Sequence, residues 1–83
     1  TGRVPLVLGR DPVSDLPVLD PAVSRRHAEL SLDEADSLLQ VIDLGSRNGT
    51  WINGTRVSRG TARAGDTIAF GTVSFTVRPP DTA

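Results

Sequence analysis

Cysteine and lysine are both absent from this chain of 83 residues, and histidine occurs once, as His27. Without cysteine, the chain can form neither a disulfide framework nor a thiolate metal site. A single histidine also argues against a histidine-rich metal centre. We therefore expect no metal and no cofactor. The length suits one small domain whose stability rests on its hydrophobic core.

The chain also lacks a large excess of positive or negative charge, and it lacks long apolar runs. The formal net charge is -1, whereas nucleic-acid-binding proteins usually present a strongly basic surface. No apolar run approaches the roughly 18 residues of a membrane-spanning helix, and no signal-peptide pattern opens the chain. We expect a cytoplasmic domain, alone or as the cytosolic module of a larger protein, with no nucleic-acid partner and no membrane insertion.

The hydrophobic pattern that is present has a period of two, which is typical of β-strands. Apolar and polar residues alternate over residues 28–32 and 73–77, and shorter runs occupy residues 4–8, 16–19 and 38–43. The pairs Asn53-Gly54 and Gly71-Thr72 are signals of two-residue hairpin turns. The pattern predicts an all-β fold, an antiparallel sandwich of many short strands. We expect one domain over residues 1–78 and a flexible polar tail over residues 79–83.

Three polar clusters stand at the ends of these predicted strands. They are Gly9-Arg10, the segment Ser24-Arg25-Arg26-His27, and residues 46–54 with the sequence SRNGTWING. Taken singly, each has an ordinary explanation: a turn with a solvated arginine, a polar entry to a strand, and hairpin turns. Their order is more specific, because Gly-Arg is followed by Ser-x-x-His, then by Ser-Arg-Asn-Gly-Thr-x-x-Asn-Gly, then by Gly-Asp-x-Ile at residues 65–68.

This series closely resembles the forkhead-associated (FHA) domain family, from about residue 4 to residue 77. The resemblance implies a SMAD/FHA-like β-sandwich of about 10–11 short strands, whose loops at one end bind a phosphothreonine peptide. It implies that the phosphate is bound by Arg10, Ser24, Arg25 and Arg47. It further implies that Asn48 hydrogen-bonds the peptide main chain. The residues that it assigns to structural support of the binding loops are Gly9, His27, Gly49 and Asn53.

The chemistry of these residue types agrees with that implication. A phosphothreonine carries nearly two negative charges and strong acceptor oxygens, which call for planar arginine groups and a short hydroxyl donor. An asparagine both donates and accepts, so it can pair with an extended backbone. We therefore expect a phospho-dependent interaction module that acts with an upstream serine/threonine protein kinase. The alternatives are an FHA-like domain that binds its partner without phosphate, and an assembly domain that uses an exposed sheet edge.

An enzyme is not expected. Ser24 and His27 lie close in sequence, and Asp43 could orient the imidazole as in a hydrolase triad. However, the chain contains no Gly-x-Ser-x-Gly nucleophile motif, which is the usual setting of such a serine in α/β-hydrolases. We therefore expect His27 to brace the binding loop.

The sequence departs from the family pattern in three places. Only eight residues precede Gly9, where the family usually has another strand, so a first strand is either trimmed or naturally absent. A sheet edge left uncovered in this way tends to pair with another molecule. Arg47 replaces the small hydroxyl residue of some members, so the resemblance implies its phosphate contact less strongly than those of Arg10 and Ser24. Ala22 and Val23 stand where peptide-selecting side chains often project, and their apolar character gives no charge-based prediction for the third residue after the phosphothreonine.

Overall fold

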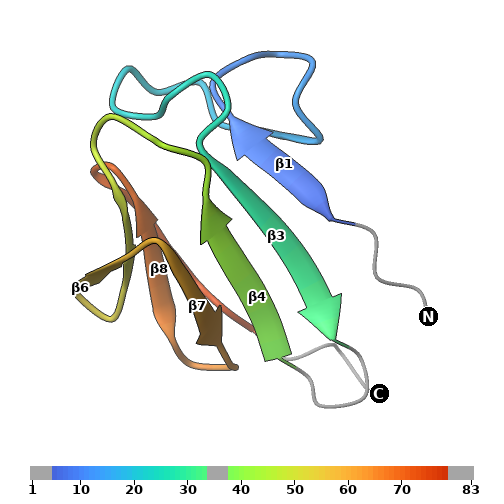
Figure 1. The fold of residues 1–83 in the computed structure, drawn as a ribbon, viewed down its shortest axis with the longest axis vertical. Helices are drawn as coiled ribbons and strands as arrows, with labels where there is room; N and C mark the ends of the chain where they lie inside the picture. Colours follow the sequence, from blue (N-terminus) through green and yellow to red (C-terminus); the bar gives the residue numbers. More distant parts are fainter. Residues whose placement is uncertain (1–4, 34–37, 79–83) are drawn as a thin grey trace.

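The computed structural model describes residues 5–33 and 38–78, which form a sandwich of two β-sheets (Figure 1). One sheet has the strand order β2-β1-β3-β4-β7 and the other has the order β6-β5-β8-β9. Their bounds are β1 (Leu6–Gly9), β2 (Leu16–Pro17), β3 (Ala28–Asp33), β4 (Leu38–Asp43), β5 (Thr50–Ile52), β6 (Thr55–Val57), β7 (Arg59–Ala62), β8 (Thr67–Phe70) and β9 (Val73–Thr76). The predicted all-β sandwich is confirmed. A search of these residues finds no helix that is long and apolar enough to cross a membrane.

Strand number and direction differ from the prediction in detail. The described residues contain nine strands rather than 10–11, and residues 1–4 and the predicted tail 79–83 lie outside them. One strand pair is parallel: Leu8 in β1 is paired with Leu16 in β2. The chain passes through residues 10–15 and returns beside β1 in the same direction. Pro17 fits this position because β2 is an edge strand, where a missing backbone N–H is tolerated.

The two predicted hairpin turns are both present. Asn53 and Gly54 have positive φ angles of 50° and 83°, and they join β5 to β6 with Ile52 opposite Thr55. Positive φ at both central positions is the requirement of the tight turn that matches the twist of paired strands. Gly71 and Thr72 join β8 to β9, with Phe70 opposite Val73. These turns fix the register of the four-stranded sheet.

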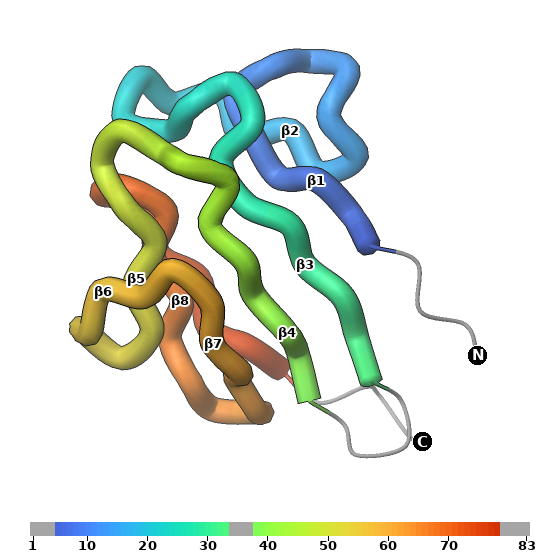
Figure 2. Tube along the Cα trace, viewed as in Figure 1, coloured from blue at the N-terminus to red at the C-terminus, as the bar shows by residue number. Residues whose placement is uncertain are grey.

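The core lies between the sheets and anchors the loops at one end of the sandwich. Its buried hydrophobic residues are Leu8, Val23, Ala28, Val41, Ala62, Ile68 and Phe70. Most of them lie on strands, but Val23 belongs to the segment that precedes β3. Figure 2 shows that the segment after β1, the segment before β3 and the β4–β5 connection gather at the same end of the molecule (top of the view). This end contains the predicted site residues.

Candidate functional site

The first part of the site is the close crossing of two chain segments at Gly9. Arg10 N–H donates to the Ser24 carbonyl (2.9 Å), and Asp11 N–H donates to the Arg25 carbonyl (3.3 Å). A Cβ atom placed on Gly9 would lie 1.9 Å from the Arg25 carbonyl oxygen. Only glycine therefore lets the segments approach this closely, and the approach brings Arg10 beside Ser24 and Arg25.

His27 connects the segment before β3 to the β4–β5 connection. Ser24 N–H donates to its Nδ1 (3.1 Å), so this nitrogen carries no proton. The proton is on Nε2, which donates to the Gly49 carbonyl (2.8 Å). The side chain is 0% exposed, and its ring meets the Phe70 ring edge-on at 5.6 Å between centroids. Both ring nitrogens are engaged, so His27 has no nitrogen available to take a proton from the Ser24 hydroxyl.

Asp43, at the end of β4, organises the β4–β5 connection. Its Oδ2 accepts from the N–H groups of Gly45 and Ser46, at 3.0 Å each. Its Oδ1 accepts from the hydroxyls of Ser46 and Thr50. Burial raises the pKa of Asp43, but these hydrogen bonds outweigh burial and lower the pKa below its usual value. Asp43 thus holds the loop that carries Arg47 and Asn48.

Gly49 takes part in hydrogen bonds with several of these segments. Its φ of 90° lies in the left-handed region, which favours glycine. Its N–H donates to the Ser46 hydroxyl (3.0 Å). Its carbonyl accepts from His27 and also from Gly71 N–H (2.9 Å), in the β8–β9 turn. The loop is therefore tied to both sheets through one residue.

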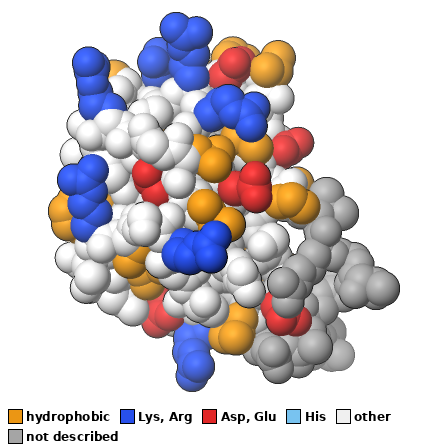
Figure 3. Space-filling view, in the orientation of Figure 1, with side chains coloured by type: hydrophobic (Ala, Val, Ile, Leu, Met, Phe, Trp, Pro, Cys, Tyr) orange, Lys and Arg blue, Asp and Glu red, His pale blue; other side chains and the backbone are white. Residues whose placement is uncertain are grey.

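The five residues predicted to contact a ligand line one hollow of about 250 Å³ at this end. We call them the rim: Arg10, Ser24, Arg25, Arg47 and Asn48. Three of the five are arginines, and no carboxylate is among the described residues that line the hollow. Figure 3 shows arginine side chains gathered at the end where the loops meet (top of the view). Such a concave positive surface attracts an anion.

The rim keeps hydrogen-bond donors that its own structure does not use. Arg10 Nε donates to the Val23 carbonyl (3.0 Å), which orients the guanidinium and leaves its two terminal nitrogens. The Ser24 hydroxyl accepts from Arg47 N–H (3.0 Å), so its own proton remains to be donated. Asn48 Nδ2 donates one hydrogen to the Ala22 carbonyl (2.8 Å), which leaves its second hydrogen and its Oδ1. These groups match the acceptors of a phosphate and an extended backbone.

Asn53 lies away from the rim. β5 begins at Thr50, next to the loop, and ends at Ile52, so Asn53 follows at the opposite end of the strand. Its Oδ1 accepts from Thr67 N–H (3.0 Å), and its own N–H donates to the Thr67 carbonyl (2.8 Å). These bonds fasten the β5–β6 turn to the start of β8. Asn53 supports the sheet, with no contact to the rim.

Two further residues differ from what the sequence suggests. Val23 is only 1% exposed, so its side chain anchors the segment in the core and does not project toward a peptide. Ala22 and Val23 are nevertheless both among the residues that line the hollow. The sequence suggests a role for Asp43 only as a partner of His27, whereas its hydrogen bonds go to Gly45, Ser46 and Thr50. An acidic residue at a strand end, with Gly-Ser beginning two residues later, is the sequence signal of such a loop.

A larger hollow of about 550 Å³ lies between the two sheets. None of the described residues that line it is charged, so it offers no partner for an anion. The smaller hollow at the rim is the candidate ligand site because the chemistry of its lining residues, rather than its size, suits a polar ligand.

Comparison with known proteins identifies the family. The FHA domain family matches residues 6–71. The glycogen accumulation regulator GarA of Mycolicibacterium smegmatis is 43% identical over 63 residues, which is 76% of this chain and 39% of GarA. The chain thus spans about two fifths of that relative's length.

Solved structures agree with this match. The FHA domain of the CT664 protein from Chlamydia trachomatis superposes with a TM-score of 0.84 at 32% identity, over 96% of this chain and 78% of that one. The N-terminal FHA domain of Rad53p from S. cerevisiae, solved with a phosphothreonine peptide, gives a TM-score of 0.65 at 33% identity, over 78% and 54% of the two chains. Together with the sandwich and the order of its loop residues, these matches establish that the chain belongs to the FHA domain family.

Proposed function

We propose that this chain is a phosphothreonine-peptide-binding module, which acts as a phospho-dependent adaptor. The observation that carries the proposal is the rim itself. One hollow of about 250 Å³ is lined by three arginines, by a serine hydroxyl with a proton to donate and by an asparagine amide that uses only one of its hydrogens. The peptide complex of the Rad53p domain supports the same chemistry for a member of this family.

Each rim residue has a distinct role in this proposal. Arg10 presents a guanidinium already oriented by the Val23 carbonyl, and Ser24 donates its hydroxyl proton to a phosphate oxygen. Arg25 and Arg47 add positive charge from the two flanking segments. Asn48 uses its remaining amide hydrogen and its Oδ1 on the peptide main chain. A serine/threonine protein kinase would supply the phosphate in the cytoplasm, so the kinase acts upstream of the interaction.

The expected affinity follows from the number of these contacts. Three to five charge-assisted hydrogen bonds at roughly 1.5–3 kcal/mol each give about 5–15 kcal/mol before the entropic cost of ordering the peptide. A net of about 8 kcal/mol corresponds to a roughly micromolar Kd. An unphosphorylated peptide makes only the main-chain contacts, so its binding should be far weaker.

The test is a calorimetric titration with a phosphothreonine peptide and its unphosphorylated twin, chosen from a peptide-library screen. We expect Arg10→Ala to weaken phosphopeptide binding about a hundredfold or more, because two charge-assisted bonds are lost. Arg59→Ala is the matched control: Arg59 is an exposed arginine on β7, and its loss changes the net charge equally. Equal binding of both peptides, or equal effects of the two variants, would indicate a partner bound without phosphate and would refute the proposal.

A further inference from the structure

An arginine that does not belong to the rim lies on β6, next to the loop that carries Asn48. Arg56 is exposed, and the described part of the chain gives it neither a hydrogen bond nor an ion pair. Its guanidinium lies over the Trp51 ring, with 5.9 Å between the guanidinium carbon and the ring centroid. None of the roles proposed for the rim uses this cation.

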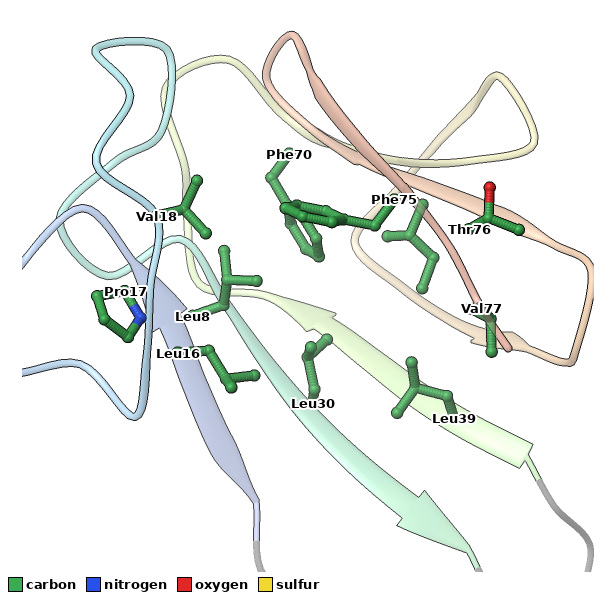
Figure 4. A pocket seen from close by; sticks show the side chains of 11 residues that line it. Leu8, Leu16, Pro17, Val18, Leu30, Leu39, Phe70, Phe75, Thr76 and Val77 are labelled. Atoms are coloured by element: carbon green, nitrogen blue, oxygen red, sulfur yellow. The ribbon is translucent and has the colours of Figure 1, made fainter. Parts of the chain in front are cut away.

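Trp51 and Arg56 lie on the outer face of the four-stranded sheet. Figure 4 shows Phe70 and Phe75 turned into the hollow between the sheets, and Thr50, which is paired with Phe70, is buried. Side chains alternate along a strand, so Trp51 points to the opposite face from Thr50. Arg56 is directly opposite Trp51 in the β5–β6 pair, so the two side chains share this outer face.

Two contacts hold this pair beside the rim. Trp51 Nε1 donates to the Asn48 carbonyl (3.3 Å), which fixes the indole to the loop. A Cβ atom placed on Gly49 would lie 2.7 Å from Arg56 Nε, so the guanidinium lies against the backbone of the residue that follows Asn48. Figure 3 shows that arginine side chains continue from the end where the loops meet along the side of the sandwich formed by β5 and β6 (left of the view).

We propose that Arg56 binds the carboxylate of an aspartate or glutamate that lies within two residues of the phosphothreonine in the target. The inference rests on the proposed function, in which Asn48 holds the peptide main chain beside the phosphothreonine. An extended peptide advances about 3.3 Å per residue, and Arg56 lies against Gly49, the neighbour of Asn48. A side chain one or two positions from the phosphothreonine is therefore within reach of Arg56.

A carboxylate suits Arg56 better than a second phosphate does. A guanidinium presents two parallel N–H groups, which match the two oxygens of a carboxylate. A phosphate dianion calls for more donors, and at the rim three arginines and the Ser24 hydroxyl surround one hollow, whereas Arg56 lies over an indole ring. The ring also restricts the guanidinium, so an ion pair loses less entropy here than at a free surface arginine.

The test is a calorimetric titration of the 83-residue chain with phosphothreonine peptides that differ in one residue. That residue is glutamate or its neutral twin glutamine, placed one or two positions before or after the phosphothreonine. The measured quantity is the Kd of the glutamine peptide divided by the Kd of the glutamate peptide. We expect this ratio to be about three to ten for at least one of the four positions in the wild type. It should fall as the salt concentration rises from about 0.05 M to about 1 M, because salt screens an exposed ion pair.

Three variants assign the effect to one side chain. Arg56→Gln should bring the ratio to about one and leave the binding of the glutamine peptides unchanged. Arg59→Gln is the matched control, because it removes an equal charge from another exposed arginine, on β7, and should keep the ratio. Arg56→Lys retains the charge without the planar fork, so its ratio should be intermediate. Thermal melts followed by circular dichroism establish that each variant is folded.

The inference is supported when the ratio survives in Arg59→Gln and disappears in Arg56→Gln. It is overturned by a ratio of about one at all four positions in the wild type, or by a ratio that Arg56→Gln retains. In both of these cases the glutamine phosphopeptides still bind, so the phosphothreonine site stands and only the role of Arg56 is lost. Failure of every phosphopeptide to bind would refute the proposed function and this inference together.

Discussion

Replacing Asp43 with alanine tests whether one carboxylate holds the loop that carries Arg47 and Asn48. The Thr50 hydroxyl donates to Asp43 and is 0% exposed, so the variant leaves it buried without its acceptor. That costs about 1–3 kcal/mol. The N–H groups of the loop can turn to water, so losing their bonds to the carboxylate adds roughly 1 kcal/mol. We expect Asp43→Ala to lower the free energy of unfolding by about 2–4 kcal/mol, a large share of the roughly 5–15 kcal/mol of a typical domain.

Urea unfolding followed by tryptophan fluorescence measures this loss. Trp51, the only tryptophan, follows Thr50 directly and reports on the loop and the sheet together. With a urea dependence of about 1 kcal/mol/M for so small a domain, the midpoint should fall by roughly 2 M or more. Asp15→Ala is the control, because it removes an exposed carboxylate that accepts one hydrogen bond, from Val7 N–H (2.9 Å). It should cost less than about 1 kcal/mol.

Asp43→Asn separates the shape of the side chain from its charge. The amide oxygen can still accept from the backbone N–H groups, and the amide nitrogen can donate to the hydroxyls, so the loss should be smaller than with alanine. Phosphopeptide affinity should fall in the same order, since the loop positions two rim residues. If Asp43→Ala unfolds at the same urea concentration as Asp15→Ala, Asp43 does not hold the loop and this reasoning fails.

Two further predictions concern the other segments and the pH. Gly9→Ala places a Cβ atom 1.9 Å from the Arg25 carbonyl oxygen, so calorimetry should show phosphopeptide affinity reduced about tenfold or more. At Gly60 the added Cβ would lie 2.8 Å from Ile52 Cδ1, the movable end of a side chain, and 3.7 Å from the Val57 methyl groups. Gly60→Ala should therefore bind phosphopeptide like the wild type, and equal losses in the two variants would contradict the account of Gly9. Because the pKa of Asp43 is lowered from 3.8, its stabilisation is complete above about pH 5 and is lost as the pH falls through the lowered folded-state pKa. The difference in urea midpoint between wild type and Asp43→Asn should therefore be constant from about pH 7 to about pH 5 and shrink below about pH 4; an unchanged difference at about pH 2 would refute this.

Features encoded by neighbouring residues could be predicted from the sequence. The alternation over residues 28–32 predicts β3, and Asn53-Gly54 predicts the β5–β6 turn, because strand faces and positive φ angles depend on a few adjacent residues. The order of the loop clusters singles out five residues that the structure places around one hollow, and their contact with a ligand stays a prediction. In each case the signal is local, or is a spacing that the family resemblance makes specific.

Features that depend on distant contacts could not be predicted. Strand β7 reads Arg-Gly-Thr-Ala, with no run of apolar residues, and it is a strand because it pairs with β4. The parallel pairing of β2 depends equally on where the chain returns. Val23 stands in a loop segment, directly before Ser24 and Arg25, yet it is buried because the loop folds over the core. Propensity and periodicity do not contain this information.

The residues that shape the loops differ from the residues that face the hollow, which explains why the rim residues keep hydrogen-bond donors for a ligand. Buried groups that face no solvent make the bonds that shape the loops: His27 bridges the two segments, and Val23 anchors one of them in the core. Each of the exposed groups makes one internal hydrogen bond that orients it, and its remaining donors and acceptors stay unused; these groups are the polar ends of Arg10, Ser24 and Asn48. A ligand therefore meets groups already held in place, and less of the binding energy is lost in ordering them. Shortening an arginine should accordingly reduce affinity with little effect on folding, whereas changes at His27 or Asp43 should reduce both.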